Sequence, residues 1–202
     1  MVRIHSEDPH TPALLHRVLS RGGVAVLPTD TLYGFSTLLS SRSGHDRIEA
    51  MKGGAEERRF LYLASGVDMV ARYIDGWGCV SREIMEAAWP APLTAVFRSG
   101  AGCPKWASPT IAFRVPASDW LRKAIDALGE PILSTSVNEA GQRPLEDPEE
   151  IERSFGARLD LMIDGGRLAG AAPSTLVDFS GESPVVLRRG GYVWDGGGKP
   201  SN

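Results

Sequence analysis

Short apolar runs alternate with segments of helical periodicity along nearly the whole chain, and this alternation limits the possible folds more than any other feature. The runs that read as strands cover residues 24–27, 60–64, 93–97, 111–115, 132–134, 159–163, 175–179 and 185–187. The segments that read as helices cover residues 11–19, 43–51, 67–74, 82–88, 119–128 and 148–155. Such alternation is typical of α/β folds, and it predicts a twisted, mostly mixed, open sheet flanked by helices.

The chain reads as one domain. Its 202 residues contain no internal repeat and no Gly/Ser-rich linker in the middle, and a hydrophobic fraction of 42% suffices for a substantial core. We therefore predict a single domain over residues 1–202, with a core at about 11–191 and a loose tail at 192–202. Thr11 is expected to cap the first helix, because hydroxyl side chains favour that position and Pro12 suits the first turn.

Charge and cysteine usage exclude several classes of protein. The formal net charge is −3 at pH 7, without the basic balance of a strong RNA-binding domain. Cys79 and Cys103 form no CxxC pair, so we expect free thiols and no protein-bound metal. No apolar run approaches membrane-spanning length and the N-terminal stretch has no apolar signal region, so we expect a cytoplasmic protein without membrane association.

A local basic face remains open despite the negative net charge. Arg122 and Lys123 read better as solvated surface charges than as part of such a face. The full set of candidates is Arg58, Arg59, Arg114, Arg122, Lys123, Arg188 and Arg189.

The segment from Pro28 to Gly34 carries the strongest functional signal. It reads Pro-Thr-Asp-Thr-Leu-Tyr-Gly and directly follows the apolar run of residues 24–27. Pro28 has no N–H and is expected to end the strand, while Gly34 is expected to let the backbone leave the turn at an unusual angle. The hydroxyls, carboxylate and phenol between them then lie at a strand end, where open α/β sheets hold their ligands. An ordinary strand-ending turn is the alternative interpretation.

Several common catalytic motifs are missing from the sequence. There is no G-x-x-x-x-G-K-[ST] loop, no G-x-G-x-x-G after a strand and no G-x-S-x-G elbow. The histidines, at positions 5, 10, 16 and 45, lie in no motif, so a histidine general base is not expected. What remains is a set of strand-end turns with hydroxyls, an amide and several cations. Such a set suits a polyanion bound together with a small polar molecule.

These turns form an ordered series of short motifs. After Pro28–Gly34 come Lys52-Gly53, Trp89-Pro90-Ala91-Pro92-Leu93-Thr94, Arg114-Val115-Pro116, Ser134-Thr135-Ser136-Val137-Asn138, Asp164-Gly165-Gly166, Pro173-Ser174-Thr175 and Leu187-Arg188-Arg189-Gly190. In this order and spacing the series resembles the YrdC/TsaC family of threonylcarbamoyladenylate synthases, over about residues 11–191. The resemblance implies the YrdC-like fold, an open α/β sheet with a concave ligand cleft.

The resemblance also implies a reaction. Family members combine L-threonine, bicarbonate and ATP, with Mg²⁺ expected on the triphosphate, into threonylcarbamoyl-AMP and pyrophosphate. The product serves the t6A modification of tRNA at adenosine 37, which partner proteins carry out. It further implies tRNA or double-stranded RNA as an additional partner. No covalent enzyme intermediate is implied, so catalysis would come from positioning and charge stabilisation.

Site residues follow from the resemblance, motif by motif. The residues implied to bind threonine are Thr31, Tyr33, Arg114, Asn138 and Ser174. The residues implied to bind ATP are Lys52, Arg58, Thr110, Ser136 and Arg188. Among these, Thr31, Arg114 and Asn138 would position the reactants.

Simpler interpretations of the same residues stay open. Thr110 and Arg114 also fit the polar entry and solvated exit of a strand. Ser136 and Asn138 also fit a turn closed by their own backbone bonds, and Ser174 fits a strand start.

The sequence departs from the family pattern in several places. Lys-Gly-Arg-Pro is usual after the second helix, whereas Gly54 replaces the arginine here. Loss of a bidentate phosphate donor weakens the phosphate side, and Arg58 or Arg59 is a hypothetical replacement. Ser118 stands where the family has histidine, and Ala91 stands in place of a glycine.

These departures keep two other functions open. One is a divergent nucleotide- or RNA-binding paralogue with weak or altered synthase activity. The other is a synthase-like enzyme that uses a different amino acid or carbamate.

Overall fold

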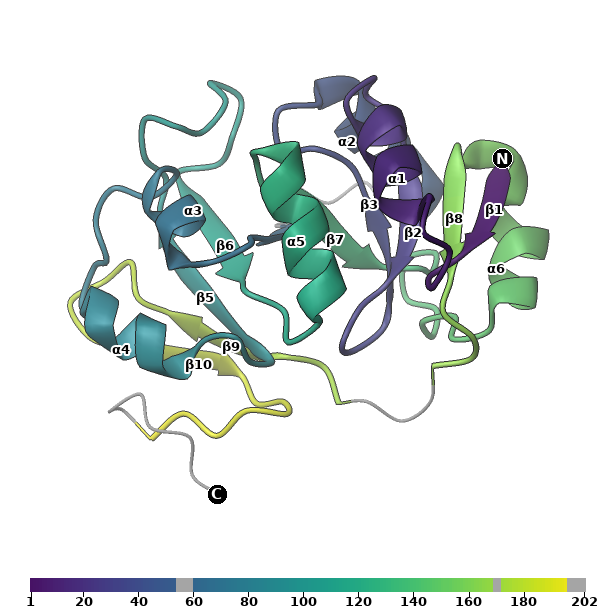
Figure 1. Ribbon diagram of the computed structural model, residues 1–202. Coiled ribbons are helices and arrows are strands. Elements are labelled where there is room, and N and C mark those ends of the chain that lie inside the picture. Colours follow the sequence, from purple (N-terminus) through teal and green to yellow (C-terminus); the bar gives the residue numbers. More distant parts are fainter. Residues whose placement is uncertain (54–59, 169–171, 196–202) are drawn as a thin grey trace. The chain divides into compact units, whose positions relative to one another are not determined.

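The computed structural model describes residues 1–53, 60–168 and 172–195. Its contacts divide the chain into two compact units (Figure 1). Unit 1 comprises residues 1–58 and 132–171, and unit 2 comprises residues 59–131 and 172–202. Each unit is therefore built from two separate stretches of sequence.

Unit 1 contains a mixed sheet. Its described strands run in the order β1 (Val2–His5), β8 (Leu161–Asp164), β2 (Ala25–Pro28), β3 (Tyr33–Ser36) and β7 (Ile132–Ser136). β8 pairs in parallel with β1 and β2, whereas β3 pairs antiparallel with both β2 and β7. Every residue of β2 and β3 is buried, which explains why β2 reads as a continuous apolar run.

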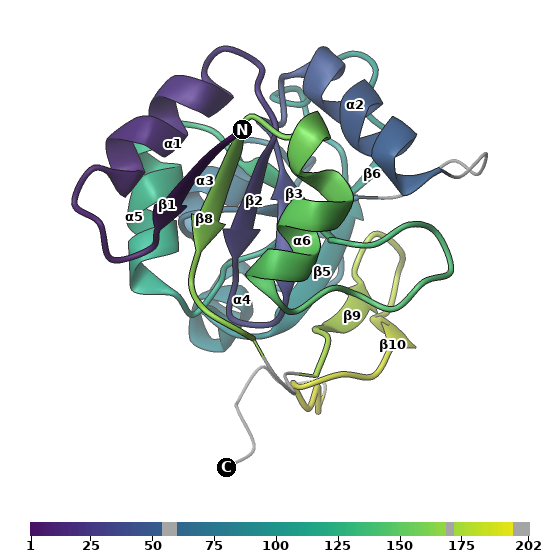
Figure 2. The ribbon, with the colours of Figure 1, turned by 90° about the vertical axis from the view of Figure 1, so that its right-hand side faces the viewer.

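Helices cover the sheet of unit 1 on both faces. They are α1 (Thr11–Leu19), α2 (Arg42–Lys52) and α6 (Pro148–Phe155), the last continued by a short 3₁₀ turn, η1 (Gly156–Arg158). Figure 2 shows β1, β8, β2 and β3 between α1 on one side and α6 on the other. The rings of Phe155 on α6 and Phe35 on β3 meet edge to face with centroids 5.0 Å apart.

Unit 2 contains a second mixed set of strands. Their order is β4 (Leu61–Leu63), β6 (Thr110–Arg114), β5 (Leu93–Arg98), β9 (Thr175–Asp178) and β10 (Val185–Arg188). β4 with β6 and β5 with β9 are parallel pairs, whereas β5 with β6 and β9 with β10 are antiparallel. The helices of unit 2 are α3 (Val67–Ala71), α4 (Arg82–Ala88) and α5 (Asp119–Leu128).

Aromatic side chains join distant parts of the unit 2 sequence. The Phe97 and Phe179 rings stack at 5.8 Å, Trp77 meets Phe97 at 5.5 Å, and Trp194 meets Phe179 at 5.0 Å. Tyr192 is only 9% exposed. The chain is thus packed onto unit 2 beyond residue 191, where the sequence predicted that a loose tail begins, because Tyr192 and Trp194 have apolar surface to bury.

The predicted α/β class with a mixed sheet and flanking helices is confirmed. The single-domain boundaries 1–202 and the concave cleft stay predictions. Helices 82–88, 119–128 and 148–155 have the bounds expected from the sequence.

Three local predictions are wrong. Thr11 is the first helical residue and not the cap: His10 occupies the cap position, and the Thr11 hydroxyl donates to His5 O at 2.7 Å. β1 and β3 were not expected as strands. Gly34 has no left-handed φ and lies inside β3, where a Cβ atom would come 2.7 Å from Ser134 Oγ. Close packing against β7 therefore accounts for this glycine.

Candidate functional site

The turn between β2 and β3 is organised by one threonine. Thr29 Oγ1 donates to Leu32 O at 2.7 Å and accepts from the N–H groups of Thr31 and Leu32, each at 3.2 Å. The hydroxyls of Thr29 and Thr31 are 3.1 Å apart, and both residues are 9% exposed. Pro28 pairs with Tyr33 across this hairpin. Thr31 is therefore held at the end of a buried strand, as the sequence predicted.

Lys52, Ser136 and Asn138 come together in unit 1. Lys52 ends α2 and is 3% exposed, and its Nζ donates to Ser136 O at 2.7 Å and to Asn138 Oδ1 at 2.9 Å. Ser136 Oγ also donates to Asn138 Oδ1, at 2.6 Å. A buried ammonium group is costly unless it is hydrogen-bonded, and these acceptors meet that need. Residues implied by two separate motifs thus form one cluster.

The amide nitrogen of Asn138 makes contacts of a different kind. Nδ2 donates to Glu139 O at 2.8 Å and to Gln142 O at 2.9 Å, so it closes the turn that follows β7. The turn-closing interpretation of Asn138 is therefore correct for its nitrogen, while its oxygen holds Lys52. In this structure the side chain of Asn138 therefore supports the ammonium group of Lys52.

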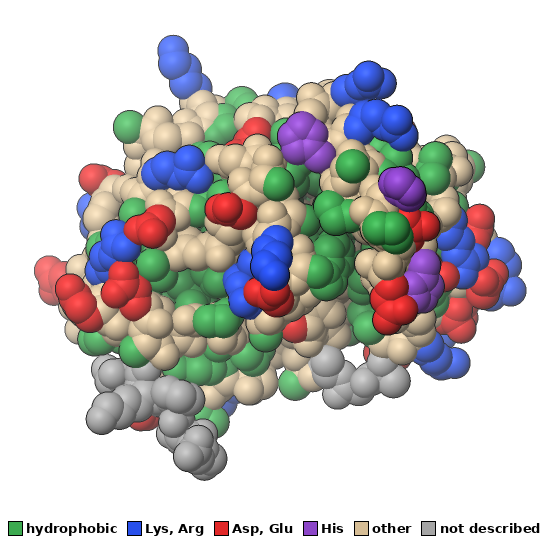
Figure 3. Space-filling view, in the orientation of Figure 1, with side chains coloured by type: hydrophobic (Ala, Val, Ile, Leu, Met, Phe, Trp, Pro, Cys, Tyr) green, Lys and Arg blue, Asp and Glu red, His purple; other side chains and the backbone are tan. Residues whose placement is uncertain are grey.

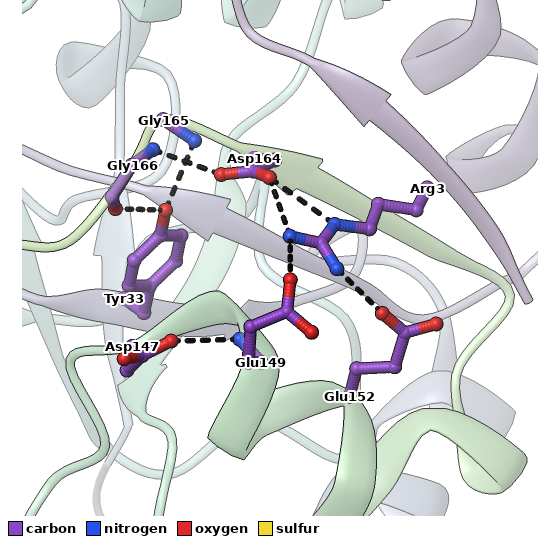
Figure 4. A network of polar contacts seen from close by, with 8 residues as sticks. All are labelled: Arg3, Tyr33, Asp147, Glu149, Glu152, Asp164, Gly165 and Gly166. Carbon is purple, nitrogen blue, oxygen red and sulfur yellow. Dashed lines mark hydrogen bonds and ion pairs between the residues drawn. The ribbon is translucent and has the colours of Figure 1, made fainter.

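Tyr33 fixes the loop after β8, as Figure 4 shows. Its hydroxyl donates to Gly166 O at 2.7 Å and accepts from Gly165 N at 2.9 Å, and the side chain is fully buried. Burial raises the pKa of the phenol above its ordinary value, and the Gly165 N–H opposes that shift. The structure thus assigns Tyr33 a positioning contact with this loop, and its place in a threonine pocket stays a prediction.

An ion-pair network anchors the same loop. Asp164 Oδ2 accepts from Arg3 Nη2 at 2.7 Å, and Asp164 Oδ1 accepts from Gly166 N at 2.9 Å. Arg3 also contacts Glu149 and Glu152 of α6, at 2.7 Å each (Figure 4). Burial disfavours the charge on Asp164, but the bonds from Arg3 and Gly166 outweigh it and hold the pKa of Asp164 below its usual value.

In unit 2, β6 carries Thr110 at its first position and Arg114 at its last. Residues four apart on a strand lie on one face, about 13 Å from each other. Arg114 is 2% exposed, so a solvated strand exit is the wrong interpretation for it. Thr110 is half-buried.

Ser174 and Arg188 also come together, within unit 2. Arg188 donates from Nε and Nη2 to Ser174 O, at 3.2 and 2.9 Å, and from Nη2 to Ser174 Oγ at 3.3 Å. Ser174 is 3% exposed and directly precedes β9. Its hydroxyl lies 2.7 Å from the hydroxyl of Thr94 on β5.

Two supporting threonines, Thr94 and Thr175, were not identified as functional from the sequence. Thr175 Oγ1 donates to Tyr192 O at 2.5 Å and accepts from the N–H groups of Gly190 and Tyr192, at 2.9 and 3.2 Å. Both threonines stand in motifs that carry the resemblance, and Thr175 directly follows Ser174, which was chosen. The signal that points to Thr175 is the pair of hydroxyl residues in its motif, whereas Thr94 is the one hydroxyl residue of its motif.

Some predicted features lie outside the described residues. They are Arg58 and Arg59, with their hypothetical role as phosphate donors, and Gly54. In the part of the chain that the structure describes, no group of three or more His, Cys, Asp or Glu side chains is placed to hold a metal ion. The described helices are all too short or too polar to cross a membrane.

A hollow of about 480 Å³ lies on unit 2 between α3 and α5. It is lined by charges of both signs, among them Asp68, Arg72, Asp119, Arg122 and Lys123. Asp119 pairs with Arg122 at 3.1 Å and with Lys123 at 2.7 Å, so these two cations are surface charges, as the sequence predicted. Acidic and basic side chains are similarly interspersed over the face drawn in Figure 3. Its lining includes none of the residues that the sequence implicated in threonine or ATP binding.

Known proteins resemble this chain over nearly its full length. Threonylcarbamoyl-AMP synthase of Halorhodospira halophila is 32% identical over 174 residues, which is 85% of this chain and 90% of that protein. Escherichia coli YciO, an uncharacterized protein, is 30% identical over 196 residues, or 93% of each chain. The YciO crystal structure superposes with a TM-score of 0.82, at 28% identity, over 93% of this chain and 94% of that one.

A more distant structure confirms the fold. The crystal structure of P. abyssi Sua5 complexed with L-threonine superposes with a TM-score of 0.83 at 23% identity. The match covers 95% of this chain but 57% of the Sua5 chain. The family model described as "Telomere recombination", which joins Sua5, YciO and YrdC, matches residues 17–190. This chain belongs to the Sua5/YciO/YrdC family.

Proposed function

We propose that this protein is an L-threonylcarbamoyladenylate synthase. It joins L-threonine and bicarbonate into a carbamate whose oxygen attacks the α-phosphorus of ATP, with release of pyrophosphate and water. The product, threonylcarbamoyl-AMP, supplies the t6A modification of tRNA in the cytoplasm. The observation that carries the proposal is the cluster of Lys52, Ser136 and Asn138, a buried cation held by two acceptors.

The phosphate side of the reaction needs fixed positive charge. Lys52 is held by Ser136 and Asn138 before any ligand binds, so little reorganisation is required when charge develops on the phosphates. Arg188 is held in the same way by Ser174. Mg²⁺ would enter with the triphosphate as part of the substrate and would neutralise part of its negative charge.

The threonine side needs partners for a carboxylate and a hydroxyl. The guanidinium of Arg114 suits a carboxylate, with which it can form two parallel hydrogen bonds. Thr31 and Ser174 supply hydroxyl groups, and each is at least nine-tenths buried. Support for threonine comes from the synthase name of the Halorhodospira relative and from the Sua5 complex with L-threonine.

Pyrophosphate release tests the proposal. Purified protein is assayed with ATP, Mg²⁺ and bicarbonate, with and without L-threonine, and with the other amino acids in parallel. We expect release that requires both threonine and bicarbonate. Release with a different amino acid would contradict threonine as the substrate, and no release from folded protein would contradict the synthase assignment.

Site variants sharpen this test. We expect Asn138→Ala and Arg114→Lys to lower turnover at least tenfold, because the first removes an acceptor that holds Lys52 and the second removes the planar guanidinium proposed to hold the threonine carboxylate. Arg143→Ala is the matched control, since Arg143 is 78% exposed and lies 3.7 Å from its acidic partner Glu150. Circular dichroism confirms folding, and wild-type rates in the first two variants would refute the site.

The second candidate is a divergent nucleotide- or RNA-binding paralogue. It is favoured by Gly54, which stands where the family has a phosphate-binding arginine. Such a protein would bind ATP or RNA and release no pyrophosphate with any amino acid.

A further inference from the structure

The hydroxyls of Thr94 and Ser174 form a buried pair in unit 2. Thr94 lies on β5, is 1% exposed, and has its Oγ1 2.7 Å from Ser174 Oγ. Ser174 is 3% exposed. Because both groups are shielded from water, each hydroxyl hydrogen needs an acceptor within the protein or on a ligand.

Either hydroxyl of the Thr94–Ser174 pair can donate to the other. Among the described residues each hydroxyl is the acceptor for the other, so one of the two buried hydrogens needs an acceptor on a ligand. Donation by Thr94 leaves that hydrogen on Ser174, the residue that the resemblance implies for threonine binding.

Arg188 also donates to Ser174. A guanidinium group can only donate, so Ser174 Oγ also accepts from Arg188 Nη2, at 3.3 Å. The oxygen of Ser174 then receives two hydrogen bonds, and its own hydrogen is left without an acceptor among the described residues. Hydrogen bonds received by a hydroxyl oxygen strengthen the bond that the hydroxyl gives.

We propose that Thr94 is a positioning residue that makes Ser174 a hydrogen-bond donor to a negatively charged oxygen of the threonine substrate, the carboxylate or the carbamate. The proposal rests on the proposed function. The positive charge of Arg188 beside Ser174 favours a charged oxygen over a neutral one. Thr94 itself does not touch the substrate and acts through Ser174.

Kinetics of pyrophosphate release against L-threonine concentration test this role. Thr94→Val keeps the shape of the side chain and removes the donor, and we expect it to raise the KM for L-threonine about three- to tenfold, the cost of one hydrogen bond. Thr94→Ser keeps the donor and should restore the KM to within about twofold of wild type. Thr94→Ala serves as a second hydroxyl deletion if the valine variant folds poorly.

A double-mutant cycle separates positioning from stability. Ser174→Ala should raise the KM by itself, and Thr94→Val should add nothing in that background. Thr37→Val is the matched control, because Thr37 is fully buried in unit 1 and donates to Gly23 O at 3.0 Å. It removes the same kind of buried hydroxyl and should lower the melting temperature without changing the KM.

Each outcome is decisive. A KM in Thr94→Val equal to that of Thr37→Val, or additive effects in the cycle, would overturn the positioning role while the synthase activity stands. If the wild-type protein releases no pyrophosphate, both the proposed function and this inference are overturned. This outcome differs from the others because the wild type, and not only the variants, is inactive.

Discussion

Lys52 is a buried cation, and burial of a charge costs free energy unless the charged group is hydrogen-bonded. It is 3% exposed, and its ammonium group is stabilised by a backbone carbonyl and by a side-chain amide. The bond from Lys52 Nζ to Ser136 O connects the end of α2 to the end of β7, and Ala140 N donates to Lys52 O at 2.8 Å. Lys52 therefore links these elements, and its binding of phosphate is part of the proposed function.

Replacement of Lys52 by methionine should affect both properties. The change leaves two acceptors without their donor, so we expect the free energy of unfolding to fall by about 1–3 kcal/mol and pyrophosphate release to be lost. Denaturant titration and the pyrophosphate assay measure the two effects. Lys123→Met, at a side chain 78% exposed, is the control and should keep wild-type stability and rate. Equal behaviour of the two variants would contradict the role of Lys52.

His45 on α2 makes the stability of the protein depend on pH. Its side chain is 3% exposed, and burial lowers its pKa, although its bond to Ser41 O at 2.7 Å acts in the opposite direction. The unfolded chain binds a proton near pH 6.5 and the folded chain binds it only at lower pH. Stability is therefore complete above about pH 6.5 and falls as the pH decreases below it.

A substitution of His45 should remove this dependence. We expect the wild-type free energy of unfolding to decrease between pH 7 and 5 with a slope of at most about 1.4 kcal/mol per pH unit from this group. His45→Leu and His45→Met should both flatten that part of the profile. Urea titrations at several pH values measure it, and an unchanged slope in both variants would refute the assignment to His45.

At the scale of elements, the segment after β10 is bonded tightly to the start of β9. Gly191 N donates to Pro173 O at 2.9 Å, Gly190 N donates to Thr175 Oγ1, and Arg188 donates to Ser174 O. A Cβ atom at Gly190 would lie 2.1 Å from Pro173 O, which is closer than any side chain tolerates. Glycine is therefore required for this contact.

Gly190→Ala tests that requirement. The added methyl group would push the segment away from Ser174, so we expect a stability loss of about 1–3 kcal/mol together with a raised KM for L-threonine. Gly181→Ala is the matched control, because a Cβ there meets nothing within 4 Å and the residue has no left-handed φ. Thermal melts compare the variants, and equal melting temperatures would contradict the close approach.

The sequence predicted some elements better than others. The bounds of α5 were predicted correctly because its apolar residues recur at helical spacing and a glycine, Gly129, follows them. In the structure Gly129 ends the helix in the left-handed conformation, at φ 77°. β3 was missed because Tyr33 and Gly34, its first two residues, were assigned to the turn motif Pro28–Gly34. Pairing with β2 and β7, a tertiary effect, makes this segment a strand.

At the scale of the whole molecule, charge decides which partners are plausible. The formal net charge is −3, and the surface cations Arg122 and Lys123 are paired with Asp119, while Arg114 is buried. Double-stranded RNA is bound mainly through its phosphates, which require exposed and unneutralised cations. These features favour small anionic ligands over nucleic acid.

We therefore expect weak association with RNA. A duplex of about 20 base pairs should bind with a Kd above about 10 µM at 150 mM salt. Fluorescence anisotropy over a salt series measures the affinity and its slope. A nanomolar Kd with a steep salt dependence would contradict this expectation and favour the RNA-binding paralogue.

The sequence by itself determined the α/β class, most helix bounds and the family, because these depend on local periodicity and on motif order. It also identified Lys52, Ser136 and Asn138, and Ser174 with Arg188, as candidates in separate motifs. Only the tertiary structure showed that each set meets in space, that Asn138 supports Lys52, and that Thr94 contacts Ser174. Hydrogen bonds between residues 80 or more positions apart depend on how strands pair, and no local pattern of residues encodes that pairing.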